Sequence, residues 1–370
     1  MTFIVVCTGT AGHINPGISI AEEIRSRKPE TKIVFIGAGR ELERKLVPGA
    51  GFELINIKMS GIKRSFKLSS IIHNIKTLYN VMSSKGKVKK ILKSINPDAV
   101  IGTGGYVCYP VLKEAAKMKI PTFIHESNAQ PGMTVKMLSG IVDKVMITFS
   151  GYEEQYKFPE RLVLTGCPLR KDFYKILDGE KDNNNKEKPL VVSFWGSLGS
   201  EKMNELMATF IKRNIEEENF FHIHAAGNSR DVLTKNLTDL GITKTEQPYA
   251  DIRDYINDMP SVMKKADLVL CRAGAITLSE LTALGKPSIL VPSPYVPDNV
   301  QTINAKQLED IGGAKMIKEI ECTGNTLYES TLQILSDRIR LTEMSEALLK
   351  LSSPNATSDI VDLIFNNTRE

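Results

Sequence analysis

Short apolar runs alternate with helix-length stretches along almost the whole chain, and this alternation constrains the fold more than any other feature. It is typical of parallel α/β architecture, in which each buried strand is followed by a crossover helix. A hydrophilic, asparagine-rich stretch at 178–188 interrupts the pattern. Strand-like runs occur before it at 3–7, 32–37, 98–103, 121–125 and 144–149, and after it at 189–194, 221–226, 267–271 and 287–292. We therefore predict two doubly wound α/β domains.

Composition restricts the class of protein further. No apolar run approaches the roughly 18 residues that a membrane-spanning helix needs, and the first residues enter a strand pattern rather than a signal peptide. The five cysteines are odd in number and widely separated, and neither they nor the five histidines have metal-ligand spacing. No Asp-x-Asp pair is present to hold a divalent metal against a nucleotide diphosphate. We therefore predict a soluble protein of a reducing compartment that uses neither a metal nor a cofactor.

Basic residues are concentrated in one segment of the chain. The formal net charge is only +5, which indicates little about partners, and we predict no nucleic-acid partner. Between Glu53 and Asp98, however, there is no acidic residue. The basic residues of this segment are Lys58, Lys63, Arg64, Lys67, Lys76, Lys85, Lys87, Lys89, Lys90 and Lys93. Apolar residues at 68–82 recur beside them at helical spacing, which fits either a helix on a membrane surface or one packed on the sheet.

Each half opens with a strand that runs into a glycine-containing turn and then a helix. In the first half the turn is TGTAGH at 8–13. Small residues let the backbone approach a ligand, and a helix N-terminus presents N–H groups to an anion. The dinucleotide fingerprint G-x-G-x-x-G is absent, which argues against an oxidoreductase. His13 ends the turn, either as a general base or as a hydrogen-bonding residue at the helix start.

Two further loops of the first half follow strands in the same way. The segment GTGGY at 102–106 supplies a second small-residue turn, and HESNAQPG at 125–132 carries polar side chains. Glu126 and Asn128 are candidates for hydrogen bonds to a sugar, although Asn128 alternatively caps the next helix. Ligands of open α/β sheets bind at the carboxyl ends of the strands, so we expect such loops from both halves to line a central cleft.

The second half carries features that suit a nucleotide. The turn GSLG at 196–199 offers backbone N–H groups and the Ser197 hydroxyl to a diphosphate. A helix that starts at Ala275 would aim its positive end at phosphates, while Glu280, about 7 Å further along, suits two vicinal ribose hydroxyls. Gln301 and Asn304 are spaced to share a helix face, which suits several sugar hydroxyls. The alternative interpretation of Glu280 is an ordinary helix carboxylate, and that of Gln301 and Asn304 is a solvated helix start.

Seven segments occur in a fixed order over almost the whole chain. They are TGTAGHINPG, GTGGYVCYP, HESNAQPGMT, TGCPLR, WGSLGS, CRAGAITLSE and PDNVQTINAKQLEDIGGA. This set resembles the MurG family, the N-acetylglucosaminyltransferases of peptidoglycan synthesis, which are two-domain GT-B enzymes of glycosyltransferase family 28. The resemblance implies that His13 is the catalytic base.

The resemblance also implies the residues that bind each substrate. On the acceptor side they are Thr103, Gly104, Gly105, Tyr106 and Glu126. For UDP-N-acetylglucosamine they are Thr10, Ala11, Gly12, Asn128, Arg170, Ser197, Ile256, Arg272, Gly274, Ala275, Ile276, Thr277, Leu278, Ser279, Glu280, Gln301 and Asn304. Ile256 would lie against the uracil. The last helix, within 354–370, would cross back to the first domain, which gives domains at 1–165 and 166–353.

The chain departs from the family pattern at several loop positions. Family members usually carry glycine where this chain has Thr8, Ala11 and Trp195, and glutamine where it has Leu198. They often carry histidine or glutamine at the position of Val300. These differences bear on local contacts more than on the overall reaction.

The sequence thus leads to a specific hypothesis. It is an inverting, metal-independent transfer of N-acetylglucosamine from UDP-N-acetylglucosamine to the 4-hydroxyl of the muramyl unit of undecaprenyl-diphosphate-linked MurNAc-pentapeptide. His13 would take the hydroxyl proton, and Arg170, Arg272 and helix N-termini would stabilise the leaving diphosphate. The basic segment would hold the protein peripherally on the anionic cytoplasmic face of the membrane. The alternatives are a UDP-sugar epimerase and a GT-B transferase that acts on another lipid acceptor, such as a diacylglycerol.

Overall fold

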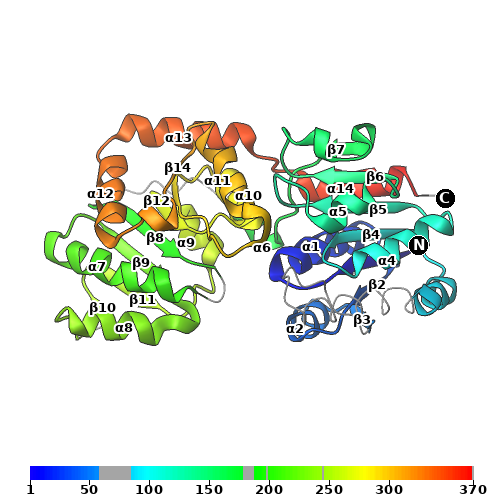
Figure 1. Ribbon diagram of the computed structural model, residues 1–370, viewed down its shortest axis with the longest axis horizontal. Coiled ribbons are helices and arrows are strands. Elements are labelled where there is room, and N and C mark those ends of the chain that lie inside the picture. Colours follow the sequence, from blue (N-terminus) through cyan, green and yellow to red (C-terminus); the bar gives the residue numbers. More distant parts are fainter. Residues whose placement is uncertain (58–84, 178–186, 197–198, 244–245, 369–370) are drawn as a thin grey trace, which may run out of the picture. The chain divides into compact units, whose positions relative to one another are not determined.

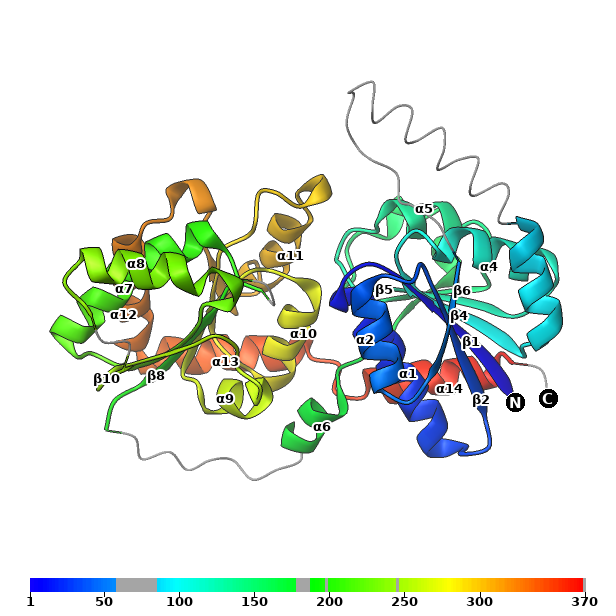
Figure 2. The same cartoon turned by 90° about the horizontal axis from the view of Figure 1, so that it is seen from below.

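The described residues form two compact units, each built on its own sheet. The computed structural model describes residues 1–57, 85–177, 187–196, 199–243 and 246–368. Unit 1 comprises Met1–Arg170 with Asn355–Glu370, and unit 2 comprises Lys171–Pro354. In each unit helices cover both faces of a mostly parallel sheet (Figures 1 and 2). The prediction of two doubly wound α/β domains is therefore confirmed.

The sheet of unit 1 has seven strands in the order β3-β2-β1-β4-β5-β6-β7. They are β1 (Thr2–Cys7), β2 (Lys32–Gly37), β3 (Glu53–Asn56), β4 (Ala99–Gly104), β5 (Thr122–Glu126), β6 (Lys144–Ile147) and β7 (Leu162–Leu164). All neighbouring strands run parallel. Alternate side chains of β1 enter two separate cores: Phe3 and Val5 lie in one, Ile4 and Val6 in the other. A strand covered on both faces is apolar without a break, and this explains the continuous run that the sequence shows.

Each core of unit 1 is closed by its own set of helices. One contains side chains of α1 (Ala11–Arg27) and α14 (Ala356–Asn366). The other contains side chains of the helical residues 85–95, of α4 (Cys108–Lys117) and of α5 (Met133–Leu138). The other helices among the described residues of the unit are α2 (Glu41–Gly49), whose Val47 also lies in the core of α1 and α14, and the 3₁₀ turns η1 (Glu153–Gln155) and η2 (Pro159–Arg161). The C-terminal helix α14 thus belongs to unit 1, next to α1 (Figures 1 and 2).

Unit 2 repeats the architecture with the strand order β10-β11-β9-β8-β12-β13-β14. Its strands are β8 (Leu190–Phe194), β9 (Phe221–Ala225), β10 (Glu246–Gln247), β11 (Ala250–Arg253), β12 (Leu268–Cys271), β13 (Ser288–Leu290) and β14 (Ala314–Met316). Only the β10 and β11 pair is antiparallel among the described strands. The edge strand β10 is therefore an addition to an otherwise parallel sheet.

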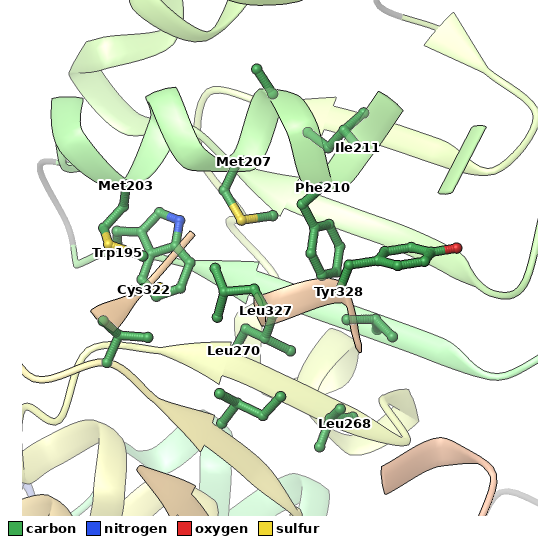
Figure 3. Close-up of a cluster of buried hydrophobic side chains, with 14 of the residues drawn as sticks. Trp195, Met203, Met207, Phe210, Ile211, Leu268, Leu270, Cys322, Leu327 and Tyr328 are labelled. Carbon is green, nitrogen blue, oxygen red and sulfur yellow. The ribbon is translucent and has the colours of Figure 1, made fainter. Parts of the chain in front are cut away.

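The helices of unit 2 cover both faces of this sheet. They are α6 (Lys171–Leu177), α7 (Glu201–Glu217), α8 (Arg230–Asp239), α9 (Met259–Lys265), α10 (Ala275–Leu284), α11 (Val300–Glu309), α12 (Gly324–Leu335) and α13 (Arg338–Leu351), with 3₁₀ turns η3 (Gly227–Ser229), η4 (Pro297–Asn299) and η5 (Glu319–Glu321). Figure 3 shows the core under α7, where Met207 and Phe210 meet Leu327 and Tyr328 of α12.

Candidate functional site

Both sheets contain the feature that positions ligands in doubly wound folds. In unit 1 the direction of winding reverses between β1 and β4, and in unit 2 it reverses between β8 and β12. At such a point the connections leave adjacent strands in opposite directions and open a crevice at the carboxyl ends. Most loops that carry predicted site residues follow these four strands and their neighbours β5 and β13, whereas Ile256 follows β11 and Arg170 follows β7. The site residues therefore fall into two sets, one on each unit.

In unit 1, a buried glutamate anchors the loop after β1. The hydroxyl of Thr8 donates a hydrogen bond to Glu43 Oε1, which also accepts the Gly9 N–H at 3.1 Å. Glu43 Oε2 accepts the N–H groups of Gly39 at 2.8 Å and Arg40 at 3.1 Å. Thr8 stands where family members usually carry glycine, and its fully buried hydroxyl is satisfied by this bond. The carboxylate thus ties the loop after β1 to the turn that follows β2.

His13 lies in the first turn of α1, with its ring against Gly104. A side chain at Gly104 would overlap the ring, and the φ of +120° there is one that only glycine adopts readily. The Thr103 hydroxyl donates to the His13 carbonyl oxygen at 2.7 Å, which joins the loops after β1 and β4. The structure therefore brings the predicted residues His13, Thr103 and Gly104 together. Thr10, Ala11 and Gly12 begin the same helix beside them.

The surroundings of His13 favour a neutral imidazole. Burial lowers the pKa of His13 from its usual 6.5, and a hydrogen bond to the backbone of Thr103 opposes that shift. A bond that raises a histidine pKa is one in which a ring N–H donates to a carbonyl oxygen. In the neutral ring the other nitrogen then carries a lone pair. His13 is half-buried rather than enclosed, so that nitrogen can accept a proton at neutral pH.

The loop after β5 is held by Glu126. Its Oε1 accepts the backbone N–H of Asn128 at 3.0 Å and the side-chain amide at 2.9 Å, and its Oε2 accepts the Gly132 N–H at 2.8 Å. Burial raises the pKa of Glu126, although these bonds oppose the shift. Gly132 is the N-cap of α5, so the alternative that Asn128 caps this helix is not realised. Glu126 orients Asn128 for the predicted sugar contact.

In unit 2, a pocket of about 470 Å³ lies at the carboxyl ends of β8, β12 and β13. This volume is within the range of roughly 300–1,000 Å³ that is usual for small-molecule sites. The lining residues are Phe194, Trp195, Gly196, Gly199, Ser200, Arg272, Gly274, Thr277, Ser293, Tyr295, Val296 and Gln301. Four of them, Arg272, Gly274, Thr277 and Gln301, were predicted from the sequence.

Two helix N-termini lie beside this pocket, and such N-termini favour anions. Helix α7 begins after Ser200, whose hydroxyl accepts the Met203 N–H, whereas α10 begins after Gly274 and has no side-chain cap. Uncapped N–H groups and the helix dipole favour a diphosphate. Gly199 adopts a φ of +78°, and a side chain there would collide with the Ala226 carbonyl oxygen. The glycine is therefore required for the close approach of the loop to the rest of the sheet.

Gln301 and Asn304 act differently in spite of their shared helix. Gln301 Oε1 accepts the Ser293 N–H at 2.8 Å, which holds the loop after β13 and leaves the amide N–H groups as donors at the pocket. Asn304 is fully buried, and its amide donates to the Ala273 carbonyl oxygen at 3.3 Å. Gln301 therefore lines the pocket, whereas Asn304 fixes the loop that leads into α10.

The other predicted residues of α10 face partly into the protein. Ala275 and Leu278 are buried, and the Ser279 hydroxyl donates to the Ala275 carbonyl oxygen at 3.0 Å. Ile276 and Glu280 are half-buried on the same helix.

The remaining predicted residues are spread over both units or fall outside the described part of the chain. Ile256 is buried in the loop after β11, and Val300 opens α11. Tyr106, Asn128 and Arg170 are half-buried in unit 1. Ser197 and Leu198 lie outside the described residues, as do Lys58, Lys63, Arg64, Lys67, Lys76 and the stretch 68–82.

Several pocket residues were not predicted. Ser200 is the N-cap of α7, and a serine directly before a helix was the available signal. Tyr295 and Ser293 belong to the proline-rich loop after β13, whose composition did not indicate which side chains reach the pocket. The ring of Trp195 packs beside Met203 and Cys322 in the core under α7 (Figure 3). A tryptophan is thus accommodated where family members usually have glycine.

A second hollow, of about 510 Å³, lies at the opposite end of the same sheet. It is lined by residues around the amino end of β14, including Lys315, Arg340 and Glu343, and by none of the predicted site residues. Because ligands of these folds bind at the carboxyl ends of the strands, the pocket at Arg272 is the better candidate site.

Comparisons with known proteins agree with these loops. Residues 3–147 match the glycosyltransferase family 28 N-terminal domain, and residues 190–362 match the glycosyltransferase family 28 C-terminal domain. A relative from Acetivibrio thermocellus is 43% identical over 368 residues, which cover 98% of this chain and 97% of the relative. A relative from Clostridioides difficile is 37% identical and covers 98% of this chain and 88% of its own. Both are named "UDP-N-acetylglucosamine--N-acetylmuramyl-(pentapeptide) pyrophosphoryl-undecaprenol N-acetylglucosamine transferase".

Solved structures show the same fold. The crystal structure of MurG from Acinetobacter baumannii superposes with a TM-score of 0.77 at 24% identity over 99% of each chain. A UDP-N-acetylglucosamine 2-epimerase from Neisseria meningitidis superposes with a TM-score of 0.65 at 14% identity, over 99% of this chain and 100% of its own. The fold is thus shared by transferases and epimerases, and the family follows from the sequence matches. The chain therefore belongs to glycosyltransferase family 28, in the MurG family that its motifs indicated.

Proposed function

We propose that this protein transfers N-acetylglucosamine from UDP-N-acetylglucosamine to the 4-hydroxyl of the muramyl unit of undecaprenyl-diphosphate-linked MurNAc-pentapeptide. The observation that carries this proposal is 43% identity, over nearly the full length, to a transferase named for these two substrates. The uncapped α10 N-terminus beside the pocket supports it, because the donor carries a diphosphate. In this proposal unit 2 binds the nucleotide sugar through Arg272, Gly274, Thr277, Gln301 and the other residues that the resemblance implies.

The proposed chemistry is a single inverting displacement. The acceptor 4-hydroxyl oxygen forms a bond to the anomeric carbon, the bond from that carbon to the diphosphate oxygen breaks, and UDP leaves with the electron pair. His13 takes the hydroxyl proton, a role supported by its lowered pKa and its half-buried position. The N-termini of α7 and α10 stabilise the charge on the leaving UDP. The described residues contain no group of three His, Cys, Asp or Glu side chains arranged to hold a metal ion.

An acceptor assay separates the proposal from its alternatives. With UDP-N-acetylglucosamine and polyprenyl-diphosphate-linked MurNAc-pentapeptide we expect a new disaccharide product and one UDP per transfer, with EDTA leaving the rate unchanged. An epimerase would change the sugar when UDP-N-acetylglucosamine is incubated alone. Product with diacylglycerol, and none with the muramyl lipid, would point to the other transferase class. Either of the last two results would contradict the proposal.

We further propose that the protein acts peripherally at an anionic, cytoplasmic membrane surface, where a polyprenyl acceptor lies. In the described part of the chain, no helix has the length and apolar character needed to cross a membrane. The helical residues 85–95 direct Val88 and Leu92 into the core of unit 1, which leaves the opposite face polar. The exposed lysines of this segment are Lys85, Lys87, Lys89, Lys90 and Lys93. Each lysine near an anionic leaflet contributes on the order of 1 kcal/mol, so five suffice for salt-sensitive binding.

Replacing these five lysines by glutamine should abolish most binding to vesicles that contain anionic phospholipid. The loss is expected because the electrostatic attraction falls with each charge removed. Co-sedimentation with vesicles of varied anionic content, at low and high salt, measures it. The matched control replaces five exposed lysines of unit 2, Lys202, Lys235, Lys306, Lys318 and Lys350. Equal losses in the two variants, or binding to neutral vesicles, would argue against this face as the docking surface.

A further inference from the structure

Arg272 forms part of the wall of the nucleotide pocket, and three protein groups contact its guanidinium. One terminal nitrogen, Nη1, donates to the Val291 carbonyl oxygen at 3.1 Å, and the other, Nη2, donates to the Ser200 hydroxyl at 3.2 Å. Nη2 also lies 2.6 Å from Glu319 Oε2. Arg272 therefore joins the loops that follow β8, β12, β13 and β14 at the carboxyl end of the sheet.

Glu319 is a buried counter-charge for this arginine. It lies in the turn η5 after β14, and only 7% of its side chain is exposed, against 9% for Arg272. Oε2 is buried, and the geometry of its close contact with Arg272 is not that of an aligned hydrogen bond. The contact is therefore mainly one of charge. Removing one member of a buried ion pair leaves the other uncompensated, which is costly in a poorly hydrated setting.

This pair decides what charge the pocket offers to a diphosphate. Among the described residues that line the pocket, Arg272 alone carries a formal charge. With Glu319 in contact, the guanidinium charge is offset, and the attraction for an anion comes chiefly from the N-termini of α7 and α10. A pocket with an unopposed arginine would hold a diphosphate more tightly, and it would release the UDP product more slowly.

We propose that Glu319 is a positioning residue of the nucleotide site, which holds Arg272 in place and offsets its charge so that UDP is bound and then released. This inference rests on the proposed function, because it takes the ligand of the pocket to be a uridine diphosphate. This role and a purely structural role predict opposite changes in UDP affinity when Glu319 is replaced. Loss of a structural support weakens every ligand, whereas loss of a counter-charge strengthens binding of the anion alone.

The test compares Glu319→Gln with Glu321→Gln. Both remove one negative charge from η5, but Glu321 is exposed and pairs with Lys318 at the surface. Uridine and UDP are titrated against each protein by calorimetry. The fluorescence of Trp195 provides a second reading, because it is the only tryptophan and its ring centroid lies 6.0 Å from the Arg272 guanidinium carbon.

We expect Glu319→Gln to bind UDP roughly tenfold more tightly than the wild type, which corresponds to about 1.4 kcal/mol. The affinity for uridine should not change, and Glu321→Gln should match the wild type for both ligands. The gain should disappear in the double variant Glu319→Gln with Arg272→Met, which removes the unpaired cation. If Glu319→Gln does not fold, Glu319→Asp keeps the charge but withdraws it from Arg272, and it should show a smaller gain in UDP affinity.

Two results would overturn the inference. One is UDP affinity in the folded Glu319 variant that equals the wild-type value. The other is weaker binding of UDP and uridine alike, which would show that Glu319 acts only as a support. If the wild-type protein failed to bind UDP at all, the proposed function would fall together with this inference. Wild-type UDP binding with no change in the Glu319 variants would reject the inference alone.

Discussion

Replacing His13 by alanine should lower kcat by about 10²–10⁴-fold and leave the Kd for UDP unchanged. The first part follows from the usual contribution of a positioned general base to a displacement. The second follows because the uridine nucleotide is assigned to the pocket of unit 2, whereas His13 belongs to unit 1. Single-turnover rates with saturating donor, together with UDP titration, measure the two quantities separately. An unchanged kcat in His13→Ala would remove this residue as the base.

The pH dependence of the wild-type enzyme provides an independent reading of the same group. Burial lowers the pKa of His13 from 6.5, so the neutral, proton-accepting form persists to lower pH than in a free histidine. The base is therefore competent above its folded-state pKa, and kcat/KM should fall as the pH drops through a value below 6.5. This acidic limb should be absent in His13→Ala, and added imidazole should restore part of the rate. A limb that persists in the variant would assign the titration to another group.

Local sequence patterns located the strands and the loops of the site. The run predicted at 98–103 is β4, Ala99–Gly104, and that at 267–271 is β12, Leu268–Cys271. The strands β3, β7, β11 and β14 were not predicted. They lie at or next to the sheet edges and are only partly buried, so they lack the long apolar run that marks a central strand. The topology then placed the loops at the switch points without further information.

Contacts between distant loops could not be predicted in this way. Glu319 and Ser200 meet Arg272 only because parallel strands bring their carboxyl ends to one edge of the sheet. Nothing in the residues around Glu319 indicates a buried ion pair. Conversely, Leu278 and Asn304 belong to segments that resemble the family, but their side chains are fully buried. A motif fixes which loop reaches a ligand, whereas packing decides which side chains of that loop do so.

Deleting residues 355–370 should unfold unit 1. These residues form α14, whose side chains Ile360, Val361 and Ile364 are fully buried in the core that they share with α1. Burying each such side chain stabilises a fold by about 1.5–3 kcal/mol, so three contribute roughly 5–9 kcal/mol. That sum is comparable with the whole stability of a typical domain, about 5–15 kcal/mol. Calorimetry should therefore show that the truncated protein lacks one unfolding transition of the full chain.

Point variants decide whether packing or charge holds α14. Ile364→Ala should lower the free energy of unfolding by about 2–5 kcal/mol, because it leaves a cavity in a closed core. Asp362→Ala removes the ion pair with Arg27, but 57% of the Asp362 side chain is exposed, so the expected loss is about 1 kcal/mol or less. Denaturant titration of the two variants compares the free energy of unfolding lost with the apolar packing and with the ion pair. A larger loss of stability in Asp362→Ala than in Ile364→Ala would mean that charge, rather than apolar burial, attaches the helix. The truncation would then be expected to lower the stability of unit 1 far less.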